Sequence, residues 1–132
     1  MNACLDAWAV LAWLDGEQPA YDEIEARLGE HPLMSWINAV EVYCRVERTH
    51  GRSQADDVLQ SLRSALELEL PTQSRMIETA RIKAAIPIAL GDCFAIATAA
   101  AHHLTLLTGD PDILERDDLT CDVKDLRPNA SD

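Results

Sequence analysis

Hydrophobic residues along this chain fall into short apolar runs separated by longer stretches where they recur every three or four positions. The short runs predict β-strands and the longer stretches predict amphipathic helices. The predicted strands lie at about 2–6, 33–36, 65–70, 104–108 and 119–124. The predicted helices span about 7–15, 20–28, 38–50, 54–65, 73–85 and 92–102, with a further helical turn at 110–111. Because strands and helices alternate, we expect an α/β fold with a mostly parallel central sheet of about four to five strands flanked by helices.

Residues that break or cap helices support these boundaries. Gly16 follows the first predicted helix, and Pro71 ends the third predicted strand. The alternation of apolar and acidic residues over 65–70 indicates a strand with one solvated side, near the edge of the sheet. Ser53 is the expected cap of the helix that follows it, and Asp92, after a helix-breaking glycine, is the expected cap of the alanine-rich helix.

The length of the chain predicts one domain over residues 1–132, with 127–132 as a frayed tail. No apolar run approaches the roughly 18 residues that a membrane-spanning helix needs. The amino terminus has no basic segment followed by an apolar core, so we expect no signal peptide. The four cysteines show no paired spacing, which favours buried thiols in a reducing compartment. We therefore expect a cytoplasmic protein without membrane partners.

Charge restricts the possible partners of the chain. The formal net charge is −12, from 23 acidic residues against 11 Lys and Arg. Such a chain repels nucleic acid at long range, so any contact with RNA or DNA must be local and assisted by a metal ion. Only six aromatic residues are present, which is too few for a platform on which bases stack.

Four separated acids lie beside predicted strand ends or helix starts: Asp6, Glu41, Asp92 and Asp110. The carboxyl ends of parallel strands share one edge of a sheet, and ligands of α/β folds bind there. The order of the elements therefore allows these carboxylates to meet at one place. Separated carboxylates that meet in this way are typical of a metal site.

Each of these acids also has a purely structural explanation. Asp6, Asp92 and Asp110 could each cap the helix that follows. Asn38 and Glu41 match a capping box, in which the Glu side chain returns to the backbone of the cap. Pattern alone leaves both explanations open.

The segments around the four acids resemble the acidic motifs of PIN-domain ribonucleases, and the chain is most similar to VapC toxins of bacterial toxin–antitoxin pairs. The resemblance extends from Asn2 to about Leu126. One departure is Ala7, where the family often has Ser or Thr. The segments that carry the resemblance are Leu5-Asp6-Ala-Trp-Ala-Val-Leu-Ala12, Asn38-Ala-Val-Glu41-Val, Leu90-Gly-Asp92-Cys-Phe-Ala-Ile-Ala-Thr-Ala99 and Leu107-Thr-Gly-Asp110-Pro-Asp112.

The resemblance implies an Mg²⁺-dependent endoribonuclease with a single PIN-like domain. It assigns one or two Mg²⁺ (or Mn²⁺) ions, which activate water against RNA, to four catalytic ligands: Asp6, Glu41, Asp92 and Asp110. Asp112 is a further candidate metal ligand, and Thr108 and Asn38 are candidates to orient the ligands. The partners implied are a cognate VapB-type antitoxin, an RNA substrate and a second copy of the chain in a homodimer.

Two other functions are compatible with an acidic α/β domain. A catalytically silent PIN-like scaffold would act by binding only. An acidic signalling module of the phospho-receiver type would need two adjacent acids near the first strand and a lysine after a late strand. Asp6 stands alone, and Lys124 lies almost at the end of the sequence, so the receiver pattern fits poorly.

Overall fold

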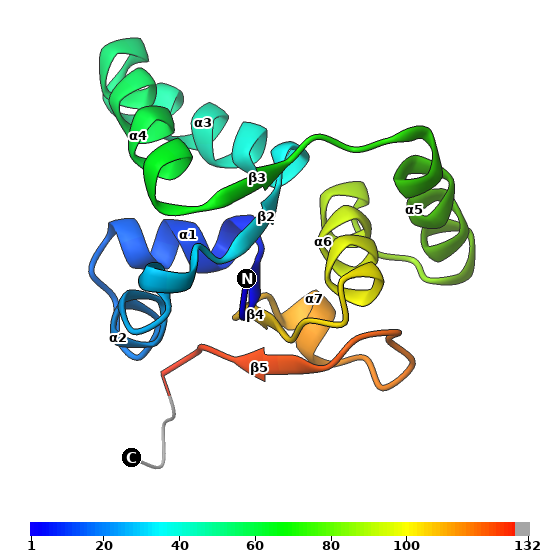
Figure 1. Cartoon of the computed structure of the whole chain (residues 1–132). Helices are drawn as coiled ribbons and strands as arrows, with labels where there is room; N and C mark the ends of the chain where they lie inside the picture. Colours follow the sequence, from blue (N-terminus) through cyan, green and yellow to red (C-terminus); the bar gives the residue numbers. More distant parts are fainter. Residues whose placement is uncertain (129–132) are drawn as a thin grey trace.

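A five-stranded parallel sheet forms the centre of the structure, a computed structural model that describes residues 1–128 (Figure 1). The strands lie in the order β3-β2-β1-β4-β5, and every neighbouring pair is parallel. This arrangement confirms the predicted α/β fold. The strands are β1 (Cys4–Leu5), β2 (Leu33–Ser35), β3 (Glu67–Glu69), β4 (Leu106–Thr108) and β5 (Val123–Asp125).

Seven α-helices connect and cover these strands within the described residues (Figure 1). A short 3₁₀ helix, η1 (Leu28–Glu30), follows the second of them, so the helix predicted over 20–28 is two pieces. The α-helices are α1 (Ala7–Leu14), α2 (Ala20–Glu25), α3 (Trp36–His50), α4 (Arg52–Ala65), α5 (Gln73–Ala85), α6 (Leu90–Ala101) and α7 (Pro111–Leu114).

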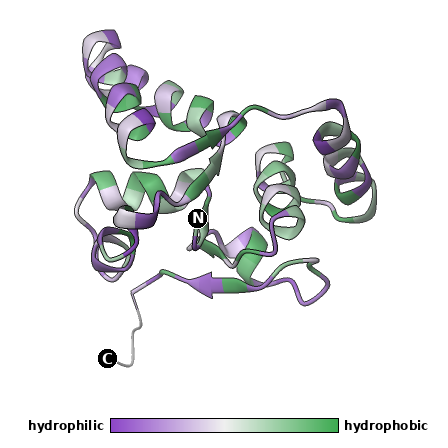
Figure 2. Cartoon of the chain, in the orientation of Figure 1, coloured by the Kyte–Doolittle hydropathy of each residue, from purple (hydrophilic) through white to green (hydrophobic). Residues whose placement is uncertain are grey.

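The two faces of the sheet carry separate apolar cores. Successive strand residues point to opposite faces, so Leu5 and Leu107 enter one core while Cys4 and Leu106 enter the other. Helices α1 to α4 cover the first face, and α6 covers the second with α5 packed on its outer side. In Figure 2, the helix α6 is mostly green to white, whereas α4 and α5 carry purple, hydrophilic segments.

Helix α6 is the most deeply buried helix, because every residue from Cys93 to Ala99 is buried. Alanine favours the helical conformation and has a short side chain, so the helix backbone can lie close to the sheet. Its amino-terminal turn is thereby fixed beside the carboxyl ends of the strands.

The start of α6 differs from the prediction. The helix begins at Leu90 with Ala89 as its N-cap, so Gly91 lies inside the helix instead of breaking the segment before it, and Asp92 is not the cap. Pro87 keeps the preceding segment out of the helix, and Ala89 is still extended, so the turn to helix falls immediately after it. Asp92 therefore lies in the first helical turn with its carboxylate free for other contacts.

Two more predicted caps were wrong. Helix α3 begins at Trp36, and its cap is Ser35, whose hydroxyl accepts a hydrogen bond from the Ile37 amide at 3.2 Å. Asn38 is consequently an interior residue of the helix. Helix α4 begins at Arg52 after Gly51, which has a φ of 91°, and this left-handed backbone makes the turn without Ser53.

The last strand is shorter than predicted. β5 comprises only Val123–Asp125, because β4 begins at Leu106 and pairs with β5 from Val123 onward. The residues 119–122 thus lie beyond the start of their only neighbouring strand. The predicted tail falls outside the described residues from 129 onward, while Arg127 is hydrogen-bonded to Asp125.

The edge position of the third predicted strand is confirmed, and the expectation of buried thiols is met in part. The strand β3, with its alternating residues, lies at one edge of the sheet. All four cysteines are free; Cys4 and Cys93 are buried, whereas Cys44 and Cys121 are partly exposed. No helix within residues 1–128 is both long and apolar enough to cross a membrane.

The two-core arrangement predicts a large effect of truncation at Leu107, which is 1% exposed. Leu107→Ala should lower the free energy of unfolding by about 2–5 kcal/mol, because the cavity adds to the lost burial. Leu90→Ala is the matched control: this leucine is 53% exposed and its truncation should cost less than about 0.5 kcal/mol. Urea titrations of both variants measure the difference, and equal losses would contradict this packing.

Candidate functional site

The strand order creates a crevice beyond the carboxyl ends of β1 and β4. The chain proceeds from β1 to β2 and β3 on one side, and then crosses to β4 on the other side of β1. Such a reversal leaves an opening between the two strands where ligands of α/β folds bind. Asp6 follows β1 directly and Asp110 follows β4 by two residues, so both acids lie at this opening. The order also differs from the 2-1-3-4-5 order of receiver domains, which the chain therefore does not share.

Asp6 is almost fully buried, at 2% exposure, and its carboxylate is held from two sides. The Ala9 amide donates to Oδ1 at 2.8 Å, which makes Asp6 the predicted cap of α1. The hydroxyl of Thr108, the last residue of β4, donates to Oδ2. Thr108 Oγ1 also accepts from the Asp110 amide at 3.0 Å, so one hydroxyl connects the two strand ends.

Asp110 caps the short helix α7, as predicted, and lies beside Asp92. The Asp112 amide donates to Asp110 Oδ1 at 2.9 Å. Capping a helix and belonging to the acidic cluster are thus compatible roles. Asp6 and Asp110 have both roles, whereas Asp92 belongs to the cluster without capping a helix.

Burial and mutual repulsion alter the acidity of the cluster. Burial first, and then the charge of Asp110 and a hydrogen bond with it, raise the pKa of Asp92 to about 8. Burial raises the pKa of Asp6 to about 7, although the hydrogen bonds from Thr108 and Ala9 act in the opposite direction. The charges of Asp110 and Glu41 contribute to both shifts. Without a cation, this site therefore retains protons near neutral pH.

Glu41 is positioned by Asn38 and Gly91. The Asn38 side chain is 1% exposed, and its Nδ2 donates both to Glu41 Oε1 at 2.7 Å and to the Gly91 carbonyl at 3.0 Å. A Cβ atom on Gly91 would lie only 2.4 Å from Glu41 Oε2. The first turn of α6 thus needs a glycine where it meets the Glu41 carboxylate.

Trp8 forms a wall of the same site. Its indole packs on Gly109, where a Cβ atom would lie 2.2 Å from the ring. The open hollow between Trp8 and the acids, of about 220 Å³, is here called the acidic cleft. It is lined by Asp6, Ala7, Trp8, Leu11, Glu41, Arg45, Asp92 and Asp110.

The structure thus brings all four predicted acids to one cleft, but their carboxylates are not all equally close to one another. Oxygen atoms of Asp92, Asp110 and Asp112 lie within 4.8 Å of one another, the one group of three potential metal ligands found in residues 1–128. Asp6 and Glu41 line the cleft outside this group. Carboxylate oxygens are the donors that Mg²⁺ and Mn²⁺ prefer, and the repulsion among them disappears when a cation binds, so the donor set fits such an ion.

Sequence reasoning missed Arg45, Gly91, Gly109 and the wall formed by Trp8. Gly91 and Gly109 each directly precede an acid of the cluster, and this repeated Gly-Asp pair was the available signal. Arg45 carried no signal, because an arginine on a helix four residues after Glu41 is expected to form a surface ion pair.

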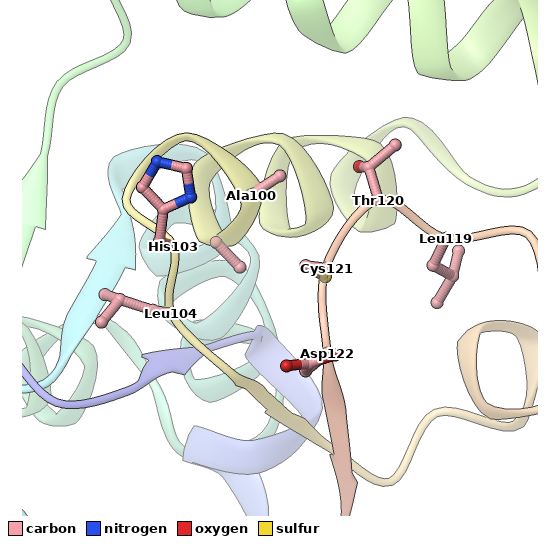
Figure 3. Close-up of a pocket in the computed structure, with 8 residues that line it drawn as sticks. Ala100, His103, Leu104, Leu119, Thr120, Cys121 and Asp122 are labelled. Carbon is pink, nitrogen blue, oxygen red and sulfur yellow. The ribbon is translucent and has the colours of Figure 1, made fainter.

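A second hollow, of about 290 Å³, lies away from the acids (Figure 3). The end of α6 and the segment before β5 contribute its lining, including His103, Cys121 and Asp122. These three side chains do not form a metal-ligand group of the kind found at Asp92. The acidic cleft is therefore the better candidate site.

The PIN domain family model matches residues 3–119, and the chain belongs to this family. PIN domains are generally nucleases that use divalent metal ions, which agrees with the carboxylate cluster. A search of curated protein sequences gave no match.

Solved structures share the fold. VapBC2 from Rickettsia felis, bound to a DNA fragment from its promoter, matches with a TM-score of 0.78 and 16% identity, over 96% of this chain and 100% of that chain. DNA-bound VapBC from Salmonella typhimurium matches with a TM-score of 0.78 and 17% identity, over 95% and 98%. VapBC-5 from Mycobacterium tuberculosis matches with a TM-score of 0.65 and 19% identity, over 95% and 98%. At these identities the likeness establishes the fold.

The raised pKa values predict how the stability of the metal-free protein depends on pH. Asp6 and Asp92 in the folded protein hold protons up to about pH 7 and 8, whereas the unfolded chain loses them near 3.8. Stability should therefore fall as pH rises from about 4 to 8 and then level off. Asp92→Asn should flatten this slope. Urea titrations in EDTA at several pH values measure it, and identical slopes for both proteins would contradict the shift.

The contact between Gly91 and Glu41 predicts that a substitution at Gly91 weakens metal binding while it hardly changes the free energy of unfolding. Gly91→Ala should leave the free energy of unfolding within about 1 kcal/mol, because alanine favours the helix and the Glu41 side chain can move aside. The same movement should weaken Mg²⁺ binding about tenfold or more. Gly29→Ala, where a Cβ atom meets nothing within 4 Å, is the control. Calorimetric titration with Mg²⁺ tests this, and unchanged affinity would show that Glu41 needs no such placement.

Proposed function

We propose that this chain is an Mg²⁺-dependent endoribonuclease and the toxin of a VapBC-type toxin–antitoxin pair. The observation that carries the proposal is the gathering of four sequence-distant acids at the crevice of a PIN fold. The solved VapBC complexes with the same fold support the toxin assignment. No feature of residues 1–128 favours the silent scaffold, since all four acids are present and share one cleft.

The carboxylates would divide the work of the site. Asp92 and Asp110 would hold the ion, with Asp112 beside them and Asp6 behind them, where the Thr108 hydroxyl fixes the orientation of its carboxylate. A divalent ion in such a site supplies an acidified water and neutralises phosphate charge. Glu41, held in place by Asn38, would be a further ligand of the ion. Each role needs an ionised carboxylate, so ion binding and proton release are coupled.

The cleft suits a single strand of RNA better than a duplex. Its volume of about 220 Å³ admits a phosphodiester and little more, and a net charge of −12 gives no long-range attraction. Trp8 supplies a flat apolar wall for a sugar or base beside the ion. An RNA substrate and an antitoxin would both be met in the cytoplasm, and the free cysteines agree with that compartment.

A ribonuclease that attacks the RNA of its own cell needs an inhibitor. We propose a small VapB-type antitoxin that lays an apolar helix on this domain and brings Arg or Lys to the acidic cleft. A basic group among these carboxylates would take the place of the metal ion and speed association at low salt.

The chain also has a surface suited to a homodimer. Leu70, before α5, and Met76 and Ile77, in its first turns, are 75%, 49% and 45% exposed. Exposed large apolar side chains that are neighbours in the chain are typical of an interface. None of these three residues lines the acidic cleft, so two copies that bury this surface would leave both clefts accessible.

Substitution of the acids tests catalysis. Asp6→Asn and Asp92→Asn should each abolish Mg²⁺-dependent cleavage of total cellular RNA and relieve growth arrest on expression. Asp57→Asn, an exposed acid on α4, is the control for lost charge and should remain active. If both site variants kept more than about a tenth of wild-type activity, a loss of under about 1.4 kcal/mol, the assignment of the site would be refuted.

The inhibitor is tested by purification from the natural source. The chain should emerge bound to a small basic protein and inactive, and removal of that protein in denaturant followed by refolding should restore RNA cleavage. Raised salt should slow reassociation, because opposite charges steer the encounter. Recovery of the chain alone, fully active and without harm to the cell, would count against a toxin–antitoxin pair.

A further inference from the structure

Arg45 connects the acidic cleft with a neighbouring groove. It lies on α3, one turn after Glu41, and is the one basic residue among the described residues that line the cleft. Arg45 and Leu11 also line a hollow of about 330 Å³ between α1, α3 and α4, here called the α1–α3 groove. The groove continues through Leu14, Val46, His50 and Val58. The side chain of Arg45 is thus at the boundary between the two spaces.

The guanidinium of Arg45 has no acceptor within residues 1–128. Glu41, four residues earlier on the same helix, would be its normal ion-pair partner. Instead, Asn38 holds the Glu41 carboxylate at 2.7 Å and Gly91 gives it room against α6. Arg27 and Arg75, by contrast, each pair with a nearby glutamate. The same contacts that build the carboxylate site therefore leave a free arginine beside it.

An RNA strand that enters the acidic cleft needs a positive group at this position. The four carboxylates repel every phosphate near them, and a divalent ion offsets that repulsion only where it binds. The phosphate next to the scissile one stays exposed to the carboxylates and to the net charge of −12. A guanidinium presents a planar fork of donors that matches the oxygens of a phosphate.

We propose that Arg45 binds the phosphate adjacent to the scissile one, and that the RNA strand leaves the cleft across Arg45 towards the α1–α3 groove. This inference rests on the proposed ribonuclease function. Four helical residues rise about 6 Å, so Arg45 and Glu41 are close enough for neighbouring phosphates of one strand to reach both. The apolar and polar lining of the groove then faces the next nucleotide.

A protein partner is the competing occupant of Arg45, and charge argues against it. The antitoxin proposed above brings a basic group to the acidic cleft, and Arg45 at the rim would repel that group. The phosphates of RNA, by contrast, are attracted by the positive charge of Arg45. Arg45 therefore favours the substrate over the inhibitor.

The cut ends produced from total cellular RNA are first mapped, and kinetics on a short single-stranded RNA that carries one such cut site then test the proposal. Arg45→Ala should raise KM about tenfold while kcat stays within about twofold, because a flanking phosphate is bound equally before and during the reaction. The plot of log kcat/KM against log salt should become shallower by about 0.7, the value of one lost phosphate contact on a single strand. Arg45→Lys should retain most of the slope. Arg48→Ala, an exposed arginine on the same helix that lines neither hollow, should match wild type.

Each other outcome overturns the proposal. Equal effects of Arg45→Ala and Arg48→Ala would mean that only net charge matters. A fall in kcat at unchanged KM would mean that Arg45 positions Glu41 and does not bind RNA. Unchanged kinetics with a weakened antitoxin complex would assign Arg45 to the partner. A wild-type protein that neither binds nor cleaves RNA would overturn the proposed function itself, and a thermal melt of Arg45→Ala separates all of these from misfolding.

Discussion

Repulsion among carboxylates is the constraint that shapes this molecule. Asp6, Glu41, Asp92 and Asp110 come from four elements that are distant in the sequence, and the reversal of strand order between β1 and β4 brings them to one cleft. Burial raises the pKa of Asp6 and of Asp92, and the like charges of their neighbours add to both shifts. The fold keeps these groups together although their repulsion opposes folding in the absence of a cation. A bound cation would relieve this repulsion, which is why we propose the cluster as a metal site.

Few residues hold the cluster in place, and each has more than one contact. Thr108 binds Asp6 with its hydroxyl proton and accepts the Asp110 amide with its oxygen, so the ends of β1 and β4 keep a fixed relation. Asn38 does the same between α3 and α6, because one amide group contacts both Glu41 and the Gly91 carbonyl. The buried helix α6 and the two apolar cores make these positions rigid. Stability and chemistry therefore depend on the same few contacts.

The sequence predicted what depends on local patterns. The spacing of apolar residues and the positions of glycine and proline located all five strands and the main helices. The alternation of apolar and acidic residues at 65–70 predicted that β3 lies at the sheet edge. Asp6 and Asp110 could be predicted as site residues because each lies within two residues of the end of an apolar strand. The local pattern left Asn38 open between a helix cap and a residue that orients the ligands, because its partner Gly91 lies 53 residues away and no local signal shows that contact. The freedom of Arg45 could not be predicted either, because it follows from that same long-range contact.

The central claim is that these carboxylates hold a divalent cation, and diffraction with Mn²⁺ tests it most directly. Crystals of the protein soaked in Mn²⁺ and measured near the manganese absorption edge locate the ion by its anomalous scattering. The account predicts a peak inside the acidic cleft, in contact with the carboxylates of Asp92 and Asp110, that is absent from crystals of Asp92→Asn. A map with no peak in the cleft, or with manganese only at other surface acids, would contradict it.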